Sequence, residues 1–423
     1  MIVSFAMATM VLVAGSVQDG TEGDAVEGYI YLDETLPENF FEARAGRVKI
    51  VPITSDTLPP AGYDKSPVNG AFIQSKDGQF RLQIGGYTQI RWNANLRDAP
   101  PGPDPEFGDE DTTTGWSLNR TRFFFEGRYT DDFSYHFRTN TNSSGDTDLL
   151  VAWAQYQMSD RWSVRFGKHF MPLSREDWMY AQDLLAVEFS PNDFTFAIGP
   201  SLGAFFHYAG NSHRGWIGLH NGAFGGEETF PAPETDVAST VRWEWNVQGD
   251  DWSVWDDMVG RRGRKRVTML GLSGGYQTAK QNTSDREAAQ INADINFNGD
   301  GYQAVVAGSA TWVDLADGND AYWNYGLMAQ LGYFVSDHGQ IYGQYNLIDP
   351  GDQSGNLDPF NSIAVGYNYF PFLWTNRWKF TAELGYVTDD LNDTIVAPSG
   401  SLGIFPTVED GQTFFRLQAQ VGF

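Results

Sequence analysis

The chain has 423 residues, with 54 acidic and 28 basic side chains, a formal net charge of −26 and no cysteine. An acidic surface of this kind argues against nucleic acid as a partner, and the lack of cysteine excludes a disulfide scaffold and a thiol nucleophile. No segment beyond the N-terminus holds the run of about 18 apolar residues that a membrane-spanning helix requires. The aromatic content of 15% and the 46 glycines are typical of a β-rich chain, either a membrane barrel or a secreted β-sandwich.

The N-terminal part differs in composition from the rest. Residues 1–16 form an apolar stretch that ends in the small residues Ala14-Gly15-Ser16, a pattern that suits cleavage of a signal peptide, although no basic residue precedes Arg44. Residues 17–79 are acidic, contain five prolines and show no sustained period. We predict that they form a flexible extension on the periplasmic side and that residues 80–423 form the folded unit.

From Phe80 onward, apolar and polar side chains alternate. In residues 117–130, one face carries Thr121, Phe123, Phe125 and Tyr129, and the other carries Arg120, Arg122, Glu126 and Arg128. Period two over this length predicts a tilted strand that meets lipid on one face and water on the other. The alternation recurs in about sixteen segments, an even number as bacterial single-chain barrels require, near residues 80–93, 117–130, 133–142, 148–159, 161–169, 201–210, 213–222, 237–248, 266–279, 288–297, 301–313, 323–336, 338–348, 361–371, 377–388 and 412–423.

The links between these segments alternate in length. Tight turns are predicted at residues 131–132, 159–160, 298–301 and 336–339. Long polar links lie between them, at 94–116, 170–200, 223–236, 349–360 and 389–411. Short turns at one end and long loops at the other are typical of an outer-membrane barrel. The link 249–265 is an exception, because it is long where a short turn is expected.

The last segment supports the same fold class. Phe415, Leu417, Ala419, Val421 and Phe423 alternate with Arg416, Gln418, Gln420 and Gly422, so the chain ends on an aromatic residue. Outer-membrane proteins resemble one another in such a strand, which their assembly machinery recognises, and this resemblance makes Phe423 the expected assembly signal. The prediction is an all-β protein, a transmembrane antiparallel β-barrel of about 16 strands in the bacterial outer membrane.

Three segments resemble the phosphate-selective porin O and P family. They are Gln83-Ile84-Gly85-Gly86-Tyr87, Leu118-Asn119-Arg120-Thr121-Arg122-Phe123 and, above all, the stretch from Arg165 to Glu176 with its Gly-Lys-x-x-x-Pro-x-Ser-Arg-Glu pattern; Asn221-Gly222 also fits. The resemblance implies a homotrimeric porin without cofactor, metal or enzymatic reaction, whose third extracellular loop, here 170–200, folds into the lumen as a constriction. It also implies a path for small anions along inward-facing basic residues, which here are Arg120, Arg122, Arg128, Arg138, Arg165, Lys168 and Arg175.

Two interpretations of the lumen remain open. Guanidinium groups offer forked donors that suit phosphate oxygens, which favours passive diffusion of anions such as phosphate. However, the constriction also carries Glu176, Asp177, Asp183 and Glu188. Arginines that pair with lumen carboxylates such as Glu126 and Glu244 would form only a polar wall, as in a general or sugar-permissive porin. A secreted β-sandwich binding protein or hydrolase is the alternative from another class.

Other motifs carry little weight. Gly271-Leu272-Ser273-Gly274-Gly275 matches the nucleophile-elbow pattern, but it lies in an alternating strand with no helix after it. The run from Asp294 to Gly299 resembles the start of a calcium loop, but its twelfth position is Val305 and its flanks are strands. His207 and His220 lie on neighbouring strands without a carboxylate at ligand spacing. Aromatic residues near the Asp131-Asp132 turn fit an interfacial girdle better than a carbohydrate-binding surface.

Overall fold

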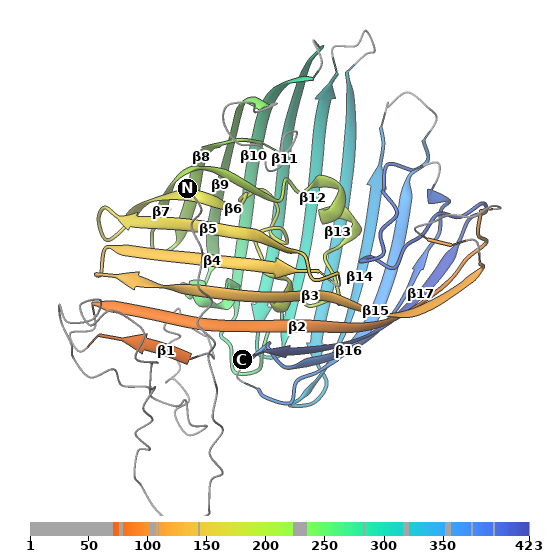
Figure 1. Ribbon diagram of the computed structural model, residues 1–423, viewed down its shortest axis with the longest axis horizontal. Coiled ribbons are helices and arrows are strands. Elements are labelled where there is room, and N and C mark those ends of the chain that lie inside the picture. Colours follow the sequence, from red (N-terminus) through yellow and green to blue (C-terminus); the bar gives the residue numbers. More distant parts are fainter. Residues whose placement is uncertain are drawn as a thin grey trace, which may run out of the picture.

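The computed structural model is built almost entirely of antiparallel strands (Figure 1). It describes residues 71–75, 79–100, 107–108, 110–142, 144–222, 235–281, 284–315, 321–351, 357–373, 375–391 and 394–422. One helix, α1 (Pro191–Phe196), and two 3-10 helices, η2 (Ala181–Asp183) and η3 (Trp252–Trp255), lie in the links. No helix in this part of the chain is long and apolar enough to cross a membrane. The strands are β1 (Ala71–Gln74), β2 (Phe80–Leu96), β3 (Thr112–Tyr129), β4 (Phe133–Thr141), β5 (Thr147–Gln157), β6 (Trp162–Phe170), β7 (Pro200–Ala209), β8 (His213–His220), β9 (Thr235–Gln248), β10 (Val267–Gln281), β11 (Ser284–Gly299), β12 (Tyr302–Asp314), β13 (Tyr322–Phe334), β14 (Gly339–Asp349), β15 (Phe360–Tyr369), β16 (Lys379–Val387) and β17 (Gln412–Gly422).

The strands from β2 to β17 form a closed ring. Each pairs with its neighbours in sequence, and β17 pairs back onto β2, from Thr413 opposite Leu96 to Gly422 opposite Tyr87. Closure gives each of these sixteen strands two partners, so that backbone N–H and C=O groups are satisfied without water. The predicted antiparallel barrel of about 16 strands is therefore confirmed. Phe423, the predicted assembly signal, lies outside the described residues.

The short strand β1 lies within the segment predicted to be an extension. It pairs with the start of β2, from Ala71 opposite Ile84 to Gln74 opposite Arg81. Since β3 occupies the other edge of β2 along its whole length, β1 lies on the edge that β17 occupies further along. β1 therefore lies near the rim where the short turns lie, which we call the turn rim.

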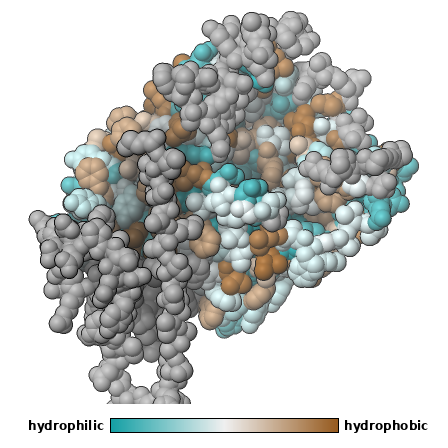
Figure 2. Space-filling view, in the orientation of Figure 1, coloured by the Kyte–Doolittle hydropathy of each residue, from teal (hydrophilic) through white to brown (hydrophobic). Residues whose placement is uncertain are grey.

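The two faces of the strands have opposite chemistry. On β3, Phe123 and Tyr129 are 43% and 66% exposed, whereas Arg120 and Arg122 are 8% and 6% exposed. Apolar side chains thus point out of the ring and charged ones point in, the reverse of a water-soluble protein. Figure 2 shows apolar residues on the outer surface of the described strands. The alternation predicted from the sequence is confirmed.

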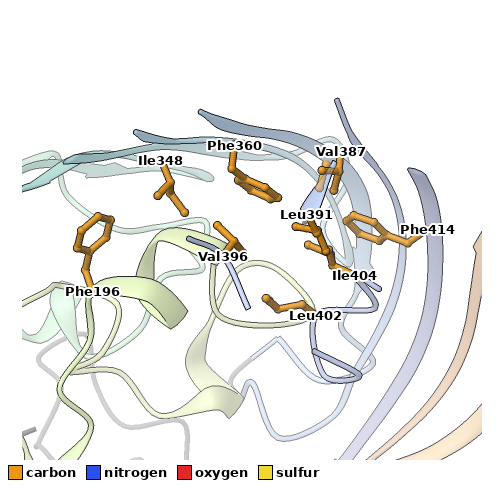
Figure 3. Packing of buried hydrophobic residues seen from close by; sticks show 10 residues of the cluster. Phe196, Ile348, Phe360, Val387, Leu391, Val396, Leu402, Ile404 and Phe414 are labelled. Atoms are coloured by element: carbon orange, nitrogen blue, oxygen red, sulfur yellow. The ribbon is translucent and has the colours of Figure 1, made fainter. Parts of the chain in front are cut away.

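The last long link, residues 388–411, folds inward at the rim opposite the turn rim. Its side chains Leu391, Val396, Leu402 and Ile404 are buried against the strand ends. Figure 3 shows them facing apolar residues of four strands, with Phe196 of α1 on the other side. This apolar cluster holds the link inside the opening, and we call residues 388–411 the C-terminal loop.

The long link between β9 and β10 also folds inward, but from the turn rim. Asn298 Nδ2 donates a hydrogen bond to Val254 O at 3.2 Å, and Gln340 Nε2 donates one to Val259 O. Gly260 has a φ of +65°, and a Cβ atom there would lie 2.5 Å from Tyr302 O, so only glycine lets the backbone pass this close. Residues 249–266, which we call the turn-side insert, are long because they cross the opening, and this explains the exception in the pattern of links.

Candidate functional site: the lumen wall and its constriction loop

The link between β6 and β7, residues 171–199, crosses the lumen and is the constriction loop predicted at 170–200. Its carboxylate Glu188 is fully buried and binds two arginines of the wall. Arg91 Nη2 lies 3.0 Å from one carboxylate oxygen, and Arg120 Nη1 lies 2.7 Å from the same oxygen. A second Arg120 nitrogen binds the other oxygen. These charge-assisted bonds fix the middle of the loop against β2 and β3.

Backbone carbonyls of the same loop bind β15 and β16, which lie on the other side of β17 from β2. Lys379 Nζ donates to Leu184 O, and Asn368 Nδ2 donates to Leu185 O, both at 2.8 Å. Burial alone would raise the pKa of Glu188, but the charges of Arg120 and Arg91 outweigh burial and hold that pKa below its usual range. Glu188 is therefore an anion that already has two cationic partners.

A second group of lumen arginines is also neutralised. Arg214 and Arg242 bind Glu244 at 2.6 and 2.7 Å. Arg242 also lies 2.8 Å from Asp294. On β17, Arg416 Nε donates to Glu383 Oε1 at 2.8 Å. At these two places, on β8 to β11 and on β16 and β17, the expectation that arginines pair with carboxylates such as Glu244 is correct, and these groups form a polar wall.

Three predicted arginines lie on a different part of the ring. Arg122, Arg138 and Arg165 project into the lumen from β3, β4 and β6, and we call them the basic wall. The hydrogen-bond acceptors of Arg122 and Arg165 are neutral: Arg122 donates to Asn140 Oδ1 and to Tyr87 Oη, each at 3.1 Å, and Arg165 donates to Gln155 Oε1 at 2.9 and 3.1 Å. Among the described residues, no carboxylate pairs with any of the three.

Aromatic rings hold the basic wall in place. The Arg138 guanidinium carbon lies 3.4 Å from the ring centre of Tyr180, in the constriction loop, and 5.0 Å from that of Phe124. Arg165 lies over Trp153 at 4.0 Å. Stacking covers the flat faces of a guanidinium and leaves its N–H groups, which lie in the plane, available as donors. Two Arg138 nitrogens, Nε and Nη1, are buried and have no hydrogen-bond partner in the described structure.

The carboxylate Glu126, which was expected to pair with arginines, binds a histidine instead. His136 Nδ1 lies 2.8 Å from Glu126 Oε2. The two residues face each other across β3 and β4, and the next inward-facing pair along these strands is Phe124 and Arg138. The His136 ring stacks at 5.6 Å on Trp153 and at 5.8 Å on Tyr180. In the described structure, Glu126 therefore forms its ion pair with His136 and none with the three arginines of the basic wall.

The remaining predicted residues lie elsewhere. Arg120 pairs with Glu188, as described above. Lys168 Nζ donates to Leu149 O at 2.9 Å. Arg128 is half exposed at the turn rim, 3.5 Å from Asp131. Arg175 is buried beneath the turn-side insert, where its guanidinium binds Trp255 O, and burial lowers its pKa to about 10.

The other carboxyl groups of the constriction loop are buried, and none of them forms an ion pair with a described residue. Burial raises the pKa of Asp193 to about 7, and burial together with the nearby Asp257 raises that of Asp183 to about 7. The pKa values of Glu176 and Asp177 are also raised, first by burial and then by the charge of Asp193. Since these groups hold protons at higher pH than usual, they repel anions less than their number suggests.

Several residues that shape the lumen escaped the sequence analysis. Arg91 and Arg242 lie on predicted inward faces, so the alternation places them in the lumen, but their partners are distant in sequence. Arg377 lies in the link after β15, stacks on Phe124 at 5.0 Å and has a pKa lowered to about 10 by burial. Its position shows no signal in the alternating pattern because it lies outside a strand.

The remaining sequence motifs, the nucleophile-elbow pattern, the calcium-loop pattern and the histidine pair, lie in barrel strands and show no sign of a catalytic or metal site among the described residues. Ser273 lies within β10, and its hydroxyl donates to Leu173 O at 2.6 Å. Asp294 lies in β11 and binds Arg242. His220 lies opposite Gly203 and His207 opposite Trp216, so the two histidines are not direct cross-strand partners. Among the described residues, no group of three or more metal-ligating side chains is positioned to hold an ion.

Comparisons with known proteins agree with this geometry. The sequence profile of the family described as "Phosphate-selective porin O and P" matches residues 101–346. No curated protein sequence matches the chain. Among solved structures, OmpT of Vibrio cholerae has 12% identity and a TM-score of 0.53 over 83% of this chain and 100% of its own. OmpF of Salmonella typhi has 12% identity and a TM-score of 0.52 over 82% and 99%.

At this level of identity, the solved structures establish the fold, a closed porin barrel. The profile match covers more than half of the chain, from the link before β3 to β14. Together with the inward-folded constriction loop, these findings exclude the alternative of a secreted β-sandwich or hydrolase. The chain belongs to the phosphate-selective porin O and P family and is a non-enzymatic porin of the bacterial outer membrane.

Proposed function

We propose that this porin conducts small anions, with inorganic phosphate as the leading candidate, along the basic wall. The observation that carries the proposal is that, within the described structure, Arg122, Arg138 and Arg165 have no carboxylate partner, whereas Arg91, Arg120, Arg214, Arg242 and Arg416 each have one. A set of fixed, unneutralised guanidinium groups attracts anions and replaces part of their hydration. The proposed transport is passive diffusion.

The stacked arrangement favours an oxyanion over a halide. Forked N–H donors match the spacing of two oxygens on one phosphate, and the aromatic contacts of Arg138 and Arg165 reduce the side-chain entropy that binding would otherwise cost. The neutral donors and acceptors beside them, such as Asn140 and Gln155, give the solute further hydrogen-bond partners. Phosphate would therefore bind briefly and slow the passage of chloride.

We also propose that the functional assembly is a homotrimer. One solved structure of OmpT from Vibrio cholerae is described as a trimer form, and it matches this chain with a TM-score of 0.52 and 13% identity. The described lipid-facing surface includes Trp116, which is 76% exposed on β3. Analytical ultracentrifugation in detergent would test this assignment, since a monomer at micromolar concentration would contradict it.

Planar-bilayer recordings test the anion proposal. In a gradient of KCl, the wild-type channel should give a reversal potential of anion-favouring sign, and phosphate should reduce the chloride current. Arg138→Ala should raise the phosphate concentration for half block by about tenfold, because the loss of one charge near the solute corresponds to roughly 1–4 kcal/mol between water and a protein surface.

The matched control is Arg214→Ala, which makes the same change in net charge at a neutralised site. Glu244 keeps Arg242 as its partner there, so phosphate block should change less than twofold. A cation-favouring reversal potential in the wild type would refute the anion proposal and favour a general porin. Equal effects of the two substitutions would show that overall charge, and not the basic wall, sets selectivity.

A further inference from the structure

The turn-side insert carries an unusual concentration of positive charge. Five of the six residues from 261 to 266 are basic, in a chain with only 28 basic residues and a net charge of −26. We call residues 261–266 the basic run. The run lies at the turn rim, which is the periplasmic opening of an outer-membrane porin.

Two members of the basic run are used to hold the insert in place. Arg264 binds Asp257, with Nη2 and Oδ2 2.6 Å apart. Burial alone would raise the pKa of Asp257, but the charge of Arg264 outweighs it and lowers that pKa to about 2. Arg261 reaches across the opening, donates to Leu373 O at 2.5 Å and lies 5.0 Å from the ring of Phe370.

The other three members have exposed side chains, and one of them, Arg262, also donates from Nη2 to Phe334 O at 2.6 Å. Lys265 and Arg266 are exposed, and no ion pair involves either of them within the described structure. Arg262 is 44% exposed on its side chain, and its only carboxylate neighbour in that part of the chain, Asp337, lies 3.9 Å away and is 80% exposed. The outer surface of the basic run therefore offers three cationic groups to a partner in the periplasm.

The chain itself contains a segment of opposite charge, which precedes β1 in the sequence. Residues 19–42 hold eight acidic residues and no basic one: Asp19, Glu22, Asp24, Glu27, Asp33, Glu34, Glu38 and Glu42. This segment connects to the barrel through β1, which pairs with the turn-rim end of β2. Its opposite charge and its covalent connection to the barrel distinguish it from any unrelated anionic partner.

We propose that the acidic segment 19–42 docks on the basic run 261–266 at the periplasmic opening. The connecting residues 43–70, about 28 in number, would span roughly 30 Å as a flexible coil. That distance is close to the diameter of roughly 30 Å expected for a sixteen-stranded ring with strands 4.8 Å apart. A tether of matching length gives the segment an effective local concentration in the millimolar range, so weak charge pairs are sufficient for docking.

Docking would reduce the positive potential at the periplasmic exit of the pore. The inference does not depend on anion selectivity, because the contact can be measured without current. With the segment docked, the exposed members of the basic run would be neutralised. Anions that leave the lumen would then be attracted less strongly to the periplasmic exit.

Disulfide cross-linking provides a direct test, because the chain has no cysteine of its own. Glu34→Cys is combined with Lys265→Cys in the full chain, refolded in neutral detergent, and oxidised. The control combines Glu34→Cys with Asp132→Cys, an exposed position in the turn after β3, which lies nearer to β2 along the ring. Tethering alone favours the control, whereas docking should make the Lys265 pair cross-link about tenfold faster.

Charge dependence completes the test. Cross-linking of the Lys265 pair should fall several-fold between about 0.05 and 1 M salt, because the screening length shrinks to about 3 Å. Arg262→Gln together with Arg266→Gln should cause a similar loss. Heat-modifiable migration on gels shows that each variant is folded, and single-channel current separates this result from a failure of the anion proposal.

Three outcomes would overturn the inference. The first is a Lys265 pair that cross-links no faster than the Asp132 pair. The second is a rate that ignores both salt and the loss of the two arginines. The third is cross-linking that persists in vesicles of phosphatidylcholine but disappears when phosphatidylglycerol is added, which would assign the basic run to anionic lipid headgroups.

Discussion

Glu188 is the carboxylate on which the position of the constriction loop depends, and Glu188→Gln tests that dependence. The side chains of Glu188 and Arg91 are 0% exposed, and that of Arg120 is 10% exposed. Glutamine keeps the shape and one acceptor but leaves two buried guanidinium groups without a counter-charge. Removal of one partner from a buried ion pair typically destabilises a protein by about 3–5 kcal/mol.

The loss should appear in two measurements. For a chain of this length, a change of about 3–5 kcal/mol corresponds to a shift of roughly 3–5 °C in the midpoint of thermal unfolding, which gel mobility after stepwise heating can follow. Single-channel recordings should show more frequent fluctuations of conductance, because the loop loses its contact with β2 and β3. The same variant should bind phosphate more tightly, since two arginines are released.

The control is Asp131→Asn, which breaks the exposed pair with Arg128. The Asp131 side chain is 87% exposed, and exposed pairs contribute about 0–1 kcal/mol. This control should therefore unfold at nearly the wild-type temperature. If Glu188→Gln showed the unfolding midpoint and the current noise of wild type, the contact of Glu188 with the two arginines would not position the loop.

The remaining predictions concern pH and the lipid face. Because burial raises the pKa of Asp193 to about 7, the loop is most stable below the normal carboxyl range and loses that stability as the pH rises to about 7, by about 1.4 kcal/mol for each unit of raised pKa. Conductance fluctuations should thus increase between pH 5 and pH 8 in the wild type and increase less in Asp193→Asn, where Asp183, with its pKa of about 7, still titrates; a pH response as large as that of the wild type would assign it to other groups. Phe123→Arg should impair assembly by about 2–4 kcal/mol if the site lies near the bilayer midplane, whereas Gln155→Arg on the lumen face of β5 should be tolerated. Equal yields of folded protein from the two variants would contradict the assigned faces.

The sequence by itself determined the class of fold and the orientation of most side chains. Alternation with period two is a local property, because successive side chains of a strand point to opposite faces whatever the strand's partners are. It therefore placed Arg122 and Arg138 in the lumen and Phe123 on the outer face. The alternation of short and long links also predicted a long loop between β6 and β7, and the resemblance to the porin family implied that this loop forms the constriction.

Only the tertiary structure decided which charges in the lumen are neutralised. Glu188 binds Arg91 and Arg120, which lie far from it in sequence, and Glu244 binds Arg214 from a neighbouring strand. Such pairs depend on the register of the strands and on the path of a loop across the ring, and neither is a local property. The same holds for residues 249–266, whose length was visible in the sequence but whose course across the opening depends on contacts with β11, β14 and the constriction loop.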